Sequence, residues 1–368
     1  MHLRWPAKLR PNHESPSRGW LFLTLALLAC LLACALPVDL LTQTPTPEAS
    51  YPPTQGASQT PTHAPTPLAT PSPYPTGPAI LSHADYTVVE TIRLTNSGPG
   101  IAEPLTLWAA KIRSLAPYQA VLESQAQPTV FEFVEDEHGN QYARFEFHNV
   151  GAGDSVEAIL TYRVRVWELS FDLSQCQQGQ MIDDFLGAER HVEVDNPSIR
   201  ALADQLSAGR DNQCQTLRAL YDYVGDNITY TSYEASDRGA VWALEHEAGD
   251  CTEFSDALLA LSRAAGIPAR FLEGVTYRAG AGSDLGETKH DWLEAYLPGH
   301  GWVPLDPTWG RFADKRDAYF ALMSADHIVV TRGRNLSTLG GYHYFYYNWR
   351  GQEVNISHQE SWELSIAD

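Results

Sequence analysis

Three residues of this chain have the types and the order of an activated cysteine nucleophile. Cys251 stands where a helix should begin, His290 follows on a run of alternating residues, and Asp306 comes sixteen residues after His290. In such a set the imidazole takes the thiol proton, while the carboxylate fixes the tautomer of the imidazole and stabilises its protonated form. The pattern therefore predicts attack of Cys251 on a carbonyl carbon, with His290 transferring protons and Asp306 orienting His290.

A helix with clear start and stop signals must position the thiol. Asp250 is the expected N-cap, and Gly266 followed by Pro268 ends the helix. The residues on the expected inner face are Cys251, Phe254, Leu258, Leu261 and Ala265. In the first turn, free backbone N–H groups and the positive end of the helix dipole favour thiolate over thiol. The same N–H groups could bind the oxyanion of a tetrahedral intermediate.

Two strands must bring the imidazole and the carboxylate together. Residues 290–296 and 302–306 are strand-like, and Pro298-Gly299-His300-Gly301 between them predicts a turn. Pairing His290 with Asp306 places the midpoint of this hairpin at Pro298, so a loose register would set the two side chains side by side. Because successive side chains of a strand point to opposite faces, Asp291 is expected to point away from His290.

Four segments around these residues resemble the core of the transglutaminase-like superfamily. They are GDCTEFS at 249–255, RAAGIPAR at 263–270, HDWLEAY at 290–296 and GWVPLDPT at 301–308. The resemblance covers roughly residues 195–312. It implies a papain-like fold, in which a helix bearing the cysteine packs on an antiparallel sheet, and it assigns the catalytic roles to Cys251, His290 and Asp306. One departure is Asp291, where many members have a small apolar residue.

The preferred hypothesis is an exported cysteine enzyme acting on amide bonds of a protein or peptide. The acyl-thioester would pass to water, as in a protease or amidase, or to an amine, as in a crosslinking acyltransferase. The alternative is a surface binding or scaffold protein that keeps the transglutaminase-like fold without turnover. The sequence leaves the substrate, the acyl acceptor and the oligomeric state open.

Other polar and aromatic residues near this region carry weaker signals. Trp242, Tyr230 and Tyr233 could assist an oxyanion, although aromatic residues there more often pack. His246 and Glu247 have no partner at metal-ligand spacing, and no calcium-binding loop pattern is present. We therefore expect neither a metal nor a cofactor. The aromatic tract 342–349 is expected to complete a sheet, with an aromatic ligand-binding wall as the other interpretation.

The N-terminus predicts export and attachment to a membrane. Basic residues precede the uncharged apolar run of residues 20–38, as in a secretory signal or an uncleaved anchor. The run contains Leu-Leu-Ala-Cys twice, ending at Cys30 and Cys34, and so resembles a bacterial lipoprotein signal with a lipid-modified cysteine. We expect residues 1–34 to form this signal or anchor. Either interpretation places the rest of the chain in the cell envelope, outside the cytoplasm, tethered to the membrane by a lipid or an N-terminal helix.

Two further regions precede the catalytic one. Residues 35–79 are dominated by Pro and Thr, a composition that favours an extended, disordered spacer. Residues 80–175 contain short alternating strands, such as 156–166, and a hairpin turn at 138–141, which predict an immunoglobulin-like β-sandwich. The transglutaminase-like domain is expected over 190–368, so the whole chain is α+β.

Charge and cysteine content limit the partners and the compartment. The net charge of −20 argues against a nucleic-acid partner, because such binding needs a basic surface. Of the five cysteines, Cys176 and Cys214 are left to form a disulfide if the chain is exported. Cys214 also fits a helix stripe as a buried apolar residue, so both interpretations stand.

Overall fold

The computed structural model describes residues 77–174, 176, 181–234, 236–280 and 288–367. The predicted signal or anchor at 1–34 and nearly all of the predicted spacer at 35–79 lie outside these residues. Within the described part of the chain, no helix is both long enough and apolar enough to cross a bilayer. Attachment to a membrane therefore stays a prediction.

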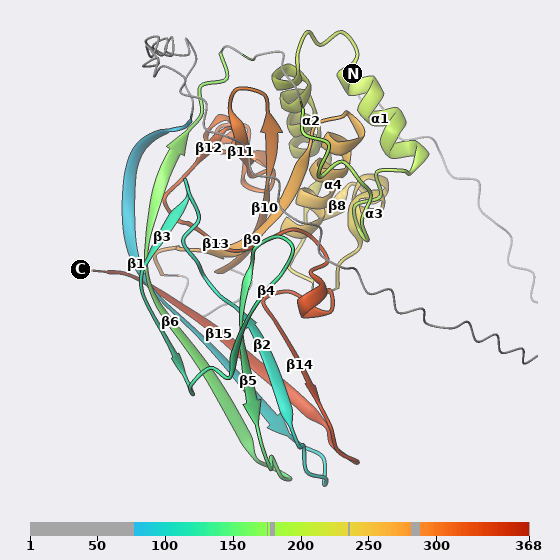
Figure 1. The fold of residues 1–368 in the computed structure, drawn as a ribbon. Helices are drawn as coiled ribbons and strands as arrows, with labels where there is room; N and C mark the ends of the chain where they lie inside the picture. The colour runs from blue at the N-terminus through green and yellow to red at the C-terminus, as the bar shows by residue number, and fades with distance from the viewer. Residues whose placement is uncertain (1–76, 175, 177–180, 235, 281–287, 368) are drawn as a thin grey trace, which may run out of the picture. The chain divides into compact units, whose positions relative to one another are not determined.

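Two antiparallel sheets form the β-rich part of the molecule (Figure 1). In the first sheet the order is β12-β6-β1-β15, and β3 also pairs with β6. Its strands are β1 (Ala79–Asn96), β3 (Gln119–Gln127), β6 (Ser155–Ser170), β12 (Leu322–Met323) and β15 (Ile356–Ile366). The alternation predicted for 156–166 is confirmed in β6, where Val164 and Val166 are buried while Arg163 and Arg165 are half-buried.

The second sheet has the order β14-β2-β5-β4. Its strands are β2 (Leu105–Ala110), β4 (Glu132–Glu135), β5 (Gln141–Phe147) and β14 (Phe345–Trp349). The predicted hairpin around 138–141 is confirmed, because β4 and β5 pair with Glu135 opposite Gln141. Both sheets contribute to one apolar core, in which Val88 and Ile92 of β1 are grouped with Leu107 of β2 and Phe145 of β5.

The last strands of the chain return to these N-terminal sheets. β15 pairs with β1 from Tyr86↔Ile366 to Asn96↔Ile356, and β14 pairs with β2 from Phe345↔Ala109 to Trp349↔Leu105. The aromatic tract therefore does complete a sheet, as expected. By hydrogen bonding, however, residues 345–366 belong to the two sheets of the first region, although they fall inside the range 190–368 expected for the transglutaminase-like domain.

A third antiparallel sheet and four helices form the region that follows. The sheet has the order β11-β10-β9-β13, with β9 (Ala269–Thr276), β10 (Lys289–Leu297), β11 (Gly301–Leu305) and β13 (His327–Arg332). The helices are α1 (Pro197–Ser207), α2 (Gln213–Asn227), α3 (Gly239–His246) and α4 (Cys251–Ala264). A short parallel pair, β7 (Thr229–Tyr230) with β8 (Ala248–Gly249), and the 3-10 turns η1 (Trp309–Arg311), η2 (Arg316–Tyr319) and η3 (Ser337–Leu339) complete the elements. The fold is thus α+β, as predicted.

Cys176 and Cys214, the two cysteines predicted to pair, form a disulfide. The Cys176 and Cys214 sulfur atoms are bonded, which joins the segment before α1 to the first turn of α2. Cys214 is also buried on the inner stripe of α2, so the two interpretations of this residue hold together. The covalent link fixes the entry of α2 against the chain that leaves β6.

Candidate active site

Helix α4 presents Cys251 in its first turn through a capping box. The side chain of Asp250 accepts a hydrogen bond from the Thr252 backbone N–H at 2.9 Å, and Glu253 accepts one from the Asp250 backbone N–H at 3.1 Å. This reciprocal arrangement satisfies backbone donors that a helix start otherwise leaves free. The predicted N-cap and the predicted helix start at Cys251 are both confirmed.

Helix α4 is buried on all sides rather than along one stripe. Every residue from Cys251 to Arg263 is buried, and the helix contacts α1, α2, α3, β9 and β10. A helix in this position is a core element, which holds its first turn rigidly. Its end is as expected, since Gly266 adopts a φ of +77° directly after the last turn.

The hairpin of β10 and β11 carries His290 and leads to Asp306. Leu293 lies opposite Leu305 and Leu297 opposite Gly301, so the midpoint falls at Gly299 rather than Pro298. Asp306 therefore lies just beyond β11 and reaches His290 diagonally. The two side chains are hydrogen-bonded, with 2.9 Å between His290 Nε2 and Asp306 Oδ2.

Asp306 is fully buried and is held as a carboxylate by its neighbours. Its Oδ1 accepts the Trp309 backbone N–H at 3.0 Å, and its Oδ2 also lies 3.4 Å from Nε2 of His327. Burial alone would raise the pKa of Asp306, but attraction to His290 and hydrogen bonds from both imidazoles outweigh it and lower the pKa. Asp306 is thus ionised across the neutral range.

His327 is a neighbour of the predicted triad that sequence reasoning missed. It lies in β13 between two carboxylates, with 2.7 Å from its Nδ1 to Asp326 Oδ1. Although burial opposes the charged form, the bonds to Asp306 and Asp326 raise the pKa of His327 to about 9. The segment Asp326-His327-Ile328 gave no periodic or spacing signal, because the contact with Asp306 depends on how β13 pairs with β9.

Asp291 lies beside the thiol, a contact that the sequence did not predict. Its Oδ2 accepts the Thr252 hydroxyl at 2.6 Å and lies 3.9 Å from Sγ of Cys251. The Ser255 hydroxyl also donates to the Asp291 backbone carbonyl at 3.1 Å. Both His290 and Asp291 line one cavity, because the first turn of α4 packs against this end of β10.

The surroundings of Cys251 disfavour the thiolate, contrary to the expectation drawn from the helix start. Burial raises the pKa of the Cys251 thiol well above its usual value, and the negative charges of Asp291 and Asp250 raise it further. A backbone hydrogen bond from Asp291 acts in the opposite direction but is outweighed. In this state the sulfur is a thiol whose hydrogen-bond partner is the Asp291 carboxyl group.

A cavity of about 40 Å³ adjoins the thiol. Its lining residues are Tyr233, Glu234, Asp237, Cys251, Thr252, Lys289, His290, Asp291, His343 and Tyr344. It brings two of the three predicted catalytic side chains to one space, with the third hydrogen-bonded behind the imidazole. Of the three aromatic candidates for the oxyanion, Tyr233 lines this cavity.

The other predicted candidates form contacts away from the cavity. Trp242 stacks on His246 within α3, with ring centroids 4.4 Å apart, and His246 Nδ1 lies 2.9 Å from the Trp242 carbonyl oxygen. Tyr230 packs beside Phe254, and the Arg311 guanidinium lies 4.6 Å from the centre of its ring. Trp242 and His246 thus pack on each other. Burial raises the pKa of Tyr230 to about 12 and the nearby Cys251 adds to it, so Tyr230 lies near the thiol although it does not line the cavity.

A charged network supports the side of the cavity opposite His290. Arg334 bridges Asp256 and Asp237, and His343 bridges Asp237 and Glu273. Burial works against a charged His343, but the two carboxylates raise its pKa well above the usual value. The network therefore places positively and negatively charged side chains alternately in the surroundings of Asp291.

Two groups in the described residues place three nitrogen or oxygen atoms within 4.8 Å of one another. They are His290, Asp306 and His327, and Glu273, Asp291 and His343. In both groups the imidazoles are hydrogen-bonded to carboxylates. We interpret both as acid–histidine hydrogen-bond networks rather than metal ligands.

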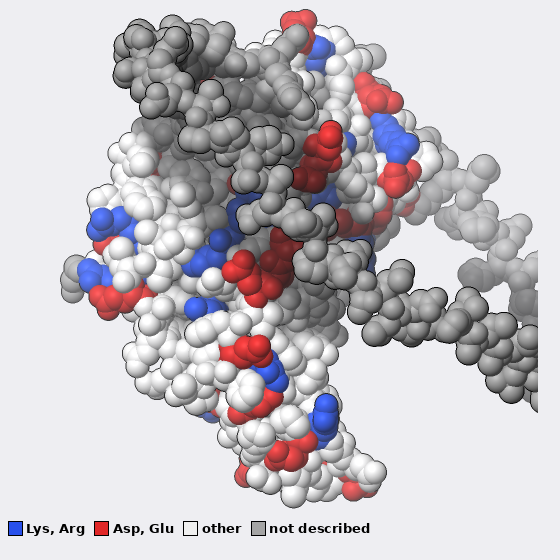
Figure 2. All heavy atoms as spheres, viewed as in Figure 1, with Lys and Arg blue, Asp and Glu red and all other residues white. Residues whose placement is uncertain are grey.

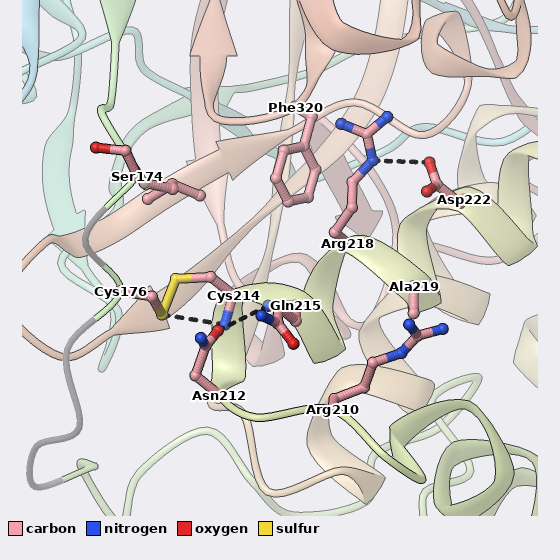
Figure 3. Close-up of a pocket in the computed structure, with 11 residues that line it drawn as sticks. Ser174, Cys176, Arg210, Asn212, Cys214, Gln215, Arg218, Ala219, Asp222 and Phe320 are labelled. Carbon is pink, nitrogen blue, oxygen red and sulfur yellow. Dashed lines mark hydrogen bonds and ion pairs between the residues drawn. A yellow bond between two sulfur atoms is a disulfide. The ribbon is translucent and has the colours of Figure 1, made fainter.

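A larger hollow of about 420 Å³ lies where α2 begins (Figure 3). Cys176 and Cys214 line it, but their sulfur atoms are joined in the disulfide, so neither offers a thiol. Arg218 at its edge is paired with Asp222 at 2.9 Å. Among the described residues that line this hollow there is neither a free thiol nor an imidazole, so the smaller cavity at Cys251 is the candidate active site.

Comparison with known proteins agrees with the geometry of this region. Residues 200–307, which include all three predicted catalytic residues, match the model of the transglutaminase-like superfamily. This part of the chain is therefore a transglutaminase-like domain.

Two curated relatives share part of the chain. YebA of Bacillus subtilis, an uncharacterized protein, is 30% identical over 171 residues, which are 41% of this chain and 23% of YebA. A protein-glutamine gamma-glutamyltransferase of Pseudomonas aeruginosa is 26% identical over 208 residues, which are 52% of this chain and 30% of the relative. The chain thus spans less than a third of the length of either relative.

A solved structure shares the fold over most of the chain. A "putative cysteine protease" from Cytophaga hutchinsonii superposes with a TM-score of 0.58 at 18% identity, covering 79% of this chain and 93% of that one. At this identity the likeness concerns the fold. It includes the β-rich region as well as the domain that carries Cys251.

Proposed function

We propose that this protein is an exported, membrane-tethered cysteine enzyme that acts on amide carbonyls through Cys251, His290 and Asp306. The observation that carries the proposal is the hydrogen bond from His290 Nε2 to Asp306. It leaves Nδ1 of His290 as the free ring nitrogen, and among the described residues Nδ1 makes no hydrogen bond. Because His290 and Cys251 line the same cavity, Nδ1 is the nitrogen available for the thiol proton.

The reaction follows from these assignments. The S–H bond of Cys251 breaks as its proton passes to His290 Nδ1, and Sγ bonds to the amide carbon to give a tetrahedral intermediate. The intermediate expels the amine, which takes the proton from His290, and a thioester on Cys251 remains. Water or a second amine then attacks the thioester, and His290 accepts its proton and returns it to the sulfur. Asp306 stabilises the imidazolium in both stages.

The proposal leaves hydrolysis and transamidation as two outcomes of one intermediate, because the acyl acceptor enters after acylation. The amide substrate is a protein or peptide. One relative is named a protein-glutamine gamma-glutamyltransferase and one similar solved structure is titled a "putative cysteine protease", which supports a shared acylation step and favours neither outcome.

The proposed location outside the cytoplasm rests on two features. The Cys176–Cys214 disulfide is typical of proteins folded in an oxidising compartment. The apolar N-terminal run and the Pro- and Thr-rich segment fit a tether followed by a spacer.

The surface charge also fits a partner other than nucleic acid. Acidic and basic side chains lie beside one another on the face drawn in Figure 2, where no broad basic patch suited to nucleic acid is seen.

Alkylation of the full chain by iodoacetamide tests the role of Cys251. We expect labelling of Cys251 in the folded protein to depend on the imidazole, so Asp306→Asn should slow it by about 10²-fold because the imidazole loses its partner. Cys251→Ser should abolish labelling at this position and His290→Ala should slow it. His358→Ala, at an exposed position of β15, is the matched control and should change nothing. Equal labelling rates in the wild type, His290→Ala and Asp306→Asn contradict the proposal.

The burial of Cys251 favours the second candidate, a surface binding or scaffold protein without turnover. Only 7% of Cys251 is exposed, and its thiol pKa is raised. The same experiment separates the two, since a non-catalytic protein predicts that His290→Ala leaves the labelling rate of Cys251 unchanged.

A further inference from the structure

We propose that Asp291 is a positioning residue that controls when Cys251 becomes nucleophilic. As a carboxylate, Asp291 accepts the thiol hydrogen bond and keeps the sulfur un-ionised; as a neutral acid, it lets His290 take that proton. This inference rests on the proposed function and concerns the regulation of the same site.

The position of Asp291 carries the argument. Within the described residues, the hydrogen-bond partner of the Cys251 thiol is Asp291 Oδ2, at 3.9 Å, and no hydrogen bond joins the thiol to His290. Two acceptors thus border one cavity with the thiol: the Asp291 carboxylate and the His290 imidazole. Only transfer to His290 produces the thiolate and imidazolium pair that attacks a carbonyl.

Hydrogen bonds from α4 fix the conformation of Asp291. The Thr252 hydroxyl donates to its Oδ2 at 2.6 Å, and the Ser255 hydroxyl donates to its backbone carbonyl at 3.1 Å. The other oxygen, Oδ1, is buried and has no hydrogen-bond partner among the residues that the structure describes. An ionised carboxylate with one unpaired, buried oxygen is costly, which favours uptake of a proton there.

The charged and titratable groups around Asp291 come from every element that packs against it. They are Cys251 and Asp250 of α4, Glu273 of β9, Arg334 after β13, His343 and Tyr344 before β14, Tyr233 and Asp237 before α3, and Lys289 and His290 on β10 itself. Burial raises the pKa of Asp291 to about 7, Glu273 raises it as well, and His343 and Arg334 lower it. Asp291 can therefore change its charge near neutral pH.

The direction of the effect follows from these signs. Above about pH 7, Asp291 is negative, and its charge beside the sulfur disfavours a second negative charge. As the pH falls through that range, the carboxyl group becomes neutral and this repulsion is removed. Removing the carboxylate by mutation should therefore lower the pH at which Cys251 becomes a thiolate.

The test compares chloroacetamide labelling of Cys251 in the full chain and in Asp291→Asn, from about pH 5 to about pH 9, with peptide mapping to separate Cys251 from other cysteines. Asparagine keeps an oxygen for the Thr252 hydroxyl but carries no charge. We expect its labelling rate near pH 7.5 to rise about tenfold, which corresponds to a shift of about one pH unit in the midpoint. Glu123→Gln, which removes an exposed carboxylate on β3, is the matched control and should leave the profile unchanged.

Equal midpoints in the wild type and Asp291→Asn, or a higher midpoint in the variant, overturn the inference while leaving the proposed function intact. Slow labelling in both proteins that is also insensitive to His290→Ala contradicts the proposed function itself. If Asp291→Asn does not fold, as judged by circular dichroism, Asp291→Ser repeats the comparison with a smaller uncharged side chain.

Discussion

At the scale of single residues, Asp306 has the central electrostatic role. It is fully buried, yet it is bonded to two imidazoles and a backbone N–H, so its negative charge is well compensated. His327 shares Oδ2 of Asp306 with His290, which couples the two imidazoles through one carboxylate. Charge on His327 should therefore stabilise both Asp306 and the fold around it.

The raised pKa of His327 predicts a pH-dependent contribution to stability. Because the folded-state pKa is about 9 and exceeds the usual 6.5, this contribution is complete below about pH 6.5 and is lost as the pH rises through about 9. The loss should reach about 3 kcal/mol of unfolding free energy, and His327→Gln should remove most of this pH dependence. Urea unfolding of both proteins at several pH values measures it; parallel curves for the two proteins would show that His327 is not charged when folded.

Much of the site could be predicted at this scale, and one contact could not. Residue types and spacing were enough to pair His290 with Asp306 and to put Cys251 at a helix start. They did not predict the contact of Asp291 with Cys251 and Thr252, because that contact depends on how the first turn of α4 packs against β10. The raised pKa of the Cys251 thiol was missed for the same reason.

At the scale of elements, the site depends on close packing of β9 beside β10. His290 lies opposite Gly274 of β9 in the register of the sheet. A Cβ at Gly274 would lie 2.1 Å from the Ile328 carbonyl oxygen and 2.6 Å from the Trp292 ring. Only glycine leaves room there for both neighbours.

Gly274→Ala should therefore destabilise the sheet that carries His290. We expect a loss of about 2 kcal/mol in unfolding free energy, because a backbone carbonyl and a buried indole cannot both move away. Gly187→Ala, where nothing lies within 4 Å of the new Cβ, is the control and should cost less than about 0.5 kcal/mol. Thermal unfolding measures both; equal melting temperatures for the two variants would refute the packing argument.

The helices and hairpins were accessible from the sequence because their signals are local. Asp250 and Gly266 bound α4 as predicted, and the turn near Gly299 joins β10 to β11. The hairpin midpoint differed by one residue, since several of the four turn residues could occupy the bend. The burial of α4 on all sides was not visible in its pattern, because it depends on three other helices and a sheet.

At the scale of the whole molecule, the two ends of the described chain are joined in one sheet. β1 lies between β6 and β15, so its hydrogen-bonding groups are paired on both sides. Two contacts join the β-rich region to the sheet that carries His290. Lys289 on β10 forms an ion pair with Glu360 on β15, and the Tyr118 hydroxyl donates a hydrogen bond to Glu294 of β10 at 2.6 Å. The β-rich region thus supports the sheet that carries the site rather than forming a separate module.

Removal of β14 and β15 should therefore unfold more than the C-terminus. A chain ending at Gly341 would lack β14 and β15, which leaves β1 and β2 with open edges. It would also expose the apolar core residues of β1 that flank the position of Trp362. We expect it to aggregate or to lose cooperative unfolding, as measured by circular dichroism and size-exclusion chromatography. A folded, monomeric truncated protein would contradict the pairing.

This long-range pairing was the part of the fold that the sequence did not disclose. The aromatic tract 342–349 predicted a strand, and its partner β2 lies more than two hundred residues earlier in the chain. Alternation defines which face of a strand is buried, but it does not select a partner among many alternating strands. For that reason the domain expected over 190–368 was drawn as one continuous segment, which includes β14 and β15.

The most direct measurement is mass spectrometry of Cys251 after incubation of the full chain with a panel of glutamine peptides and primary amines. We predict a covalent acyl adduct on the peptide that contains Cys251, and its loss in Cys251→Ser, together with amine incorporation or free carboxylate in the products. Unmodified Cys251 and unchanged peptides across the panel, in a protein whose Cys251 is still rapidly alkylated, would contradict acylation of Cys251 by amide substrates.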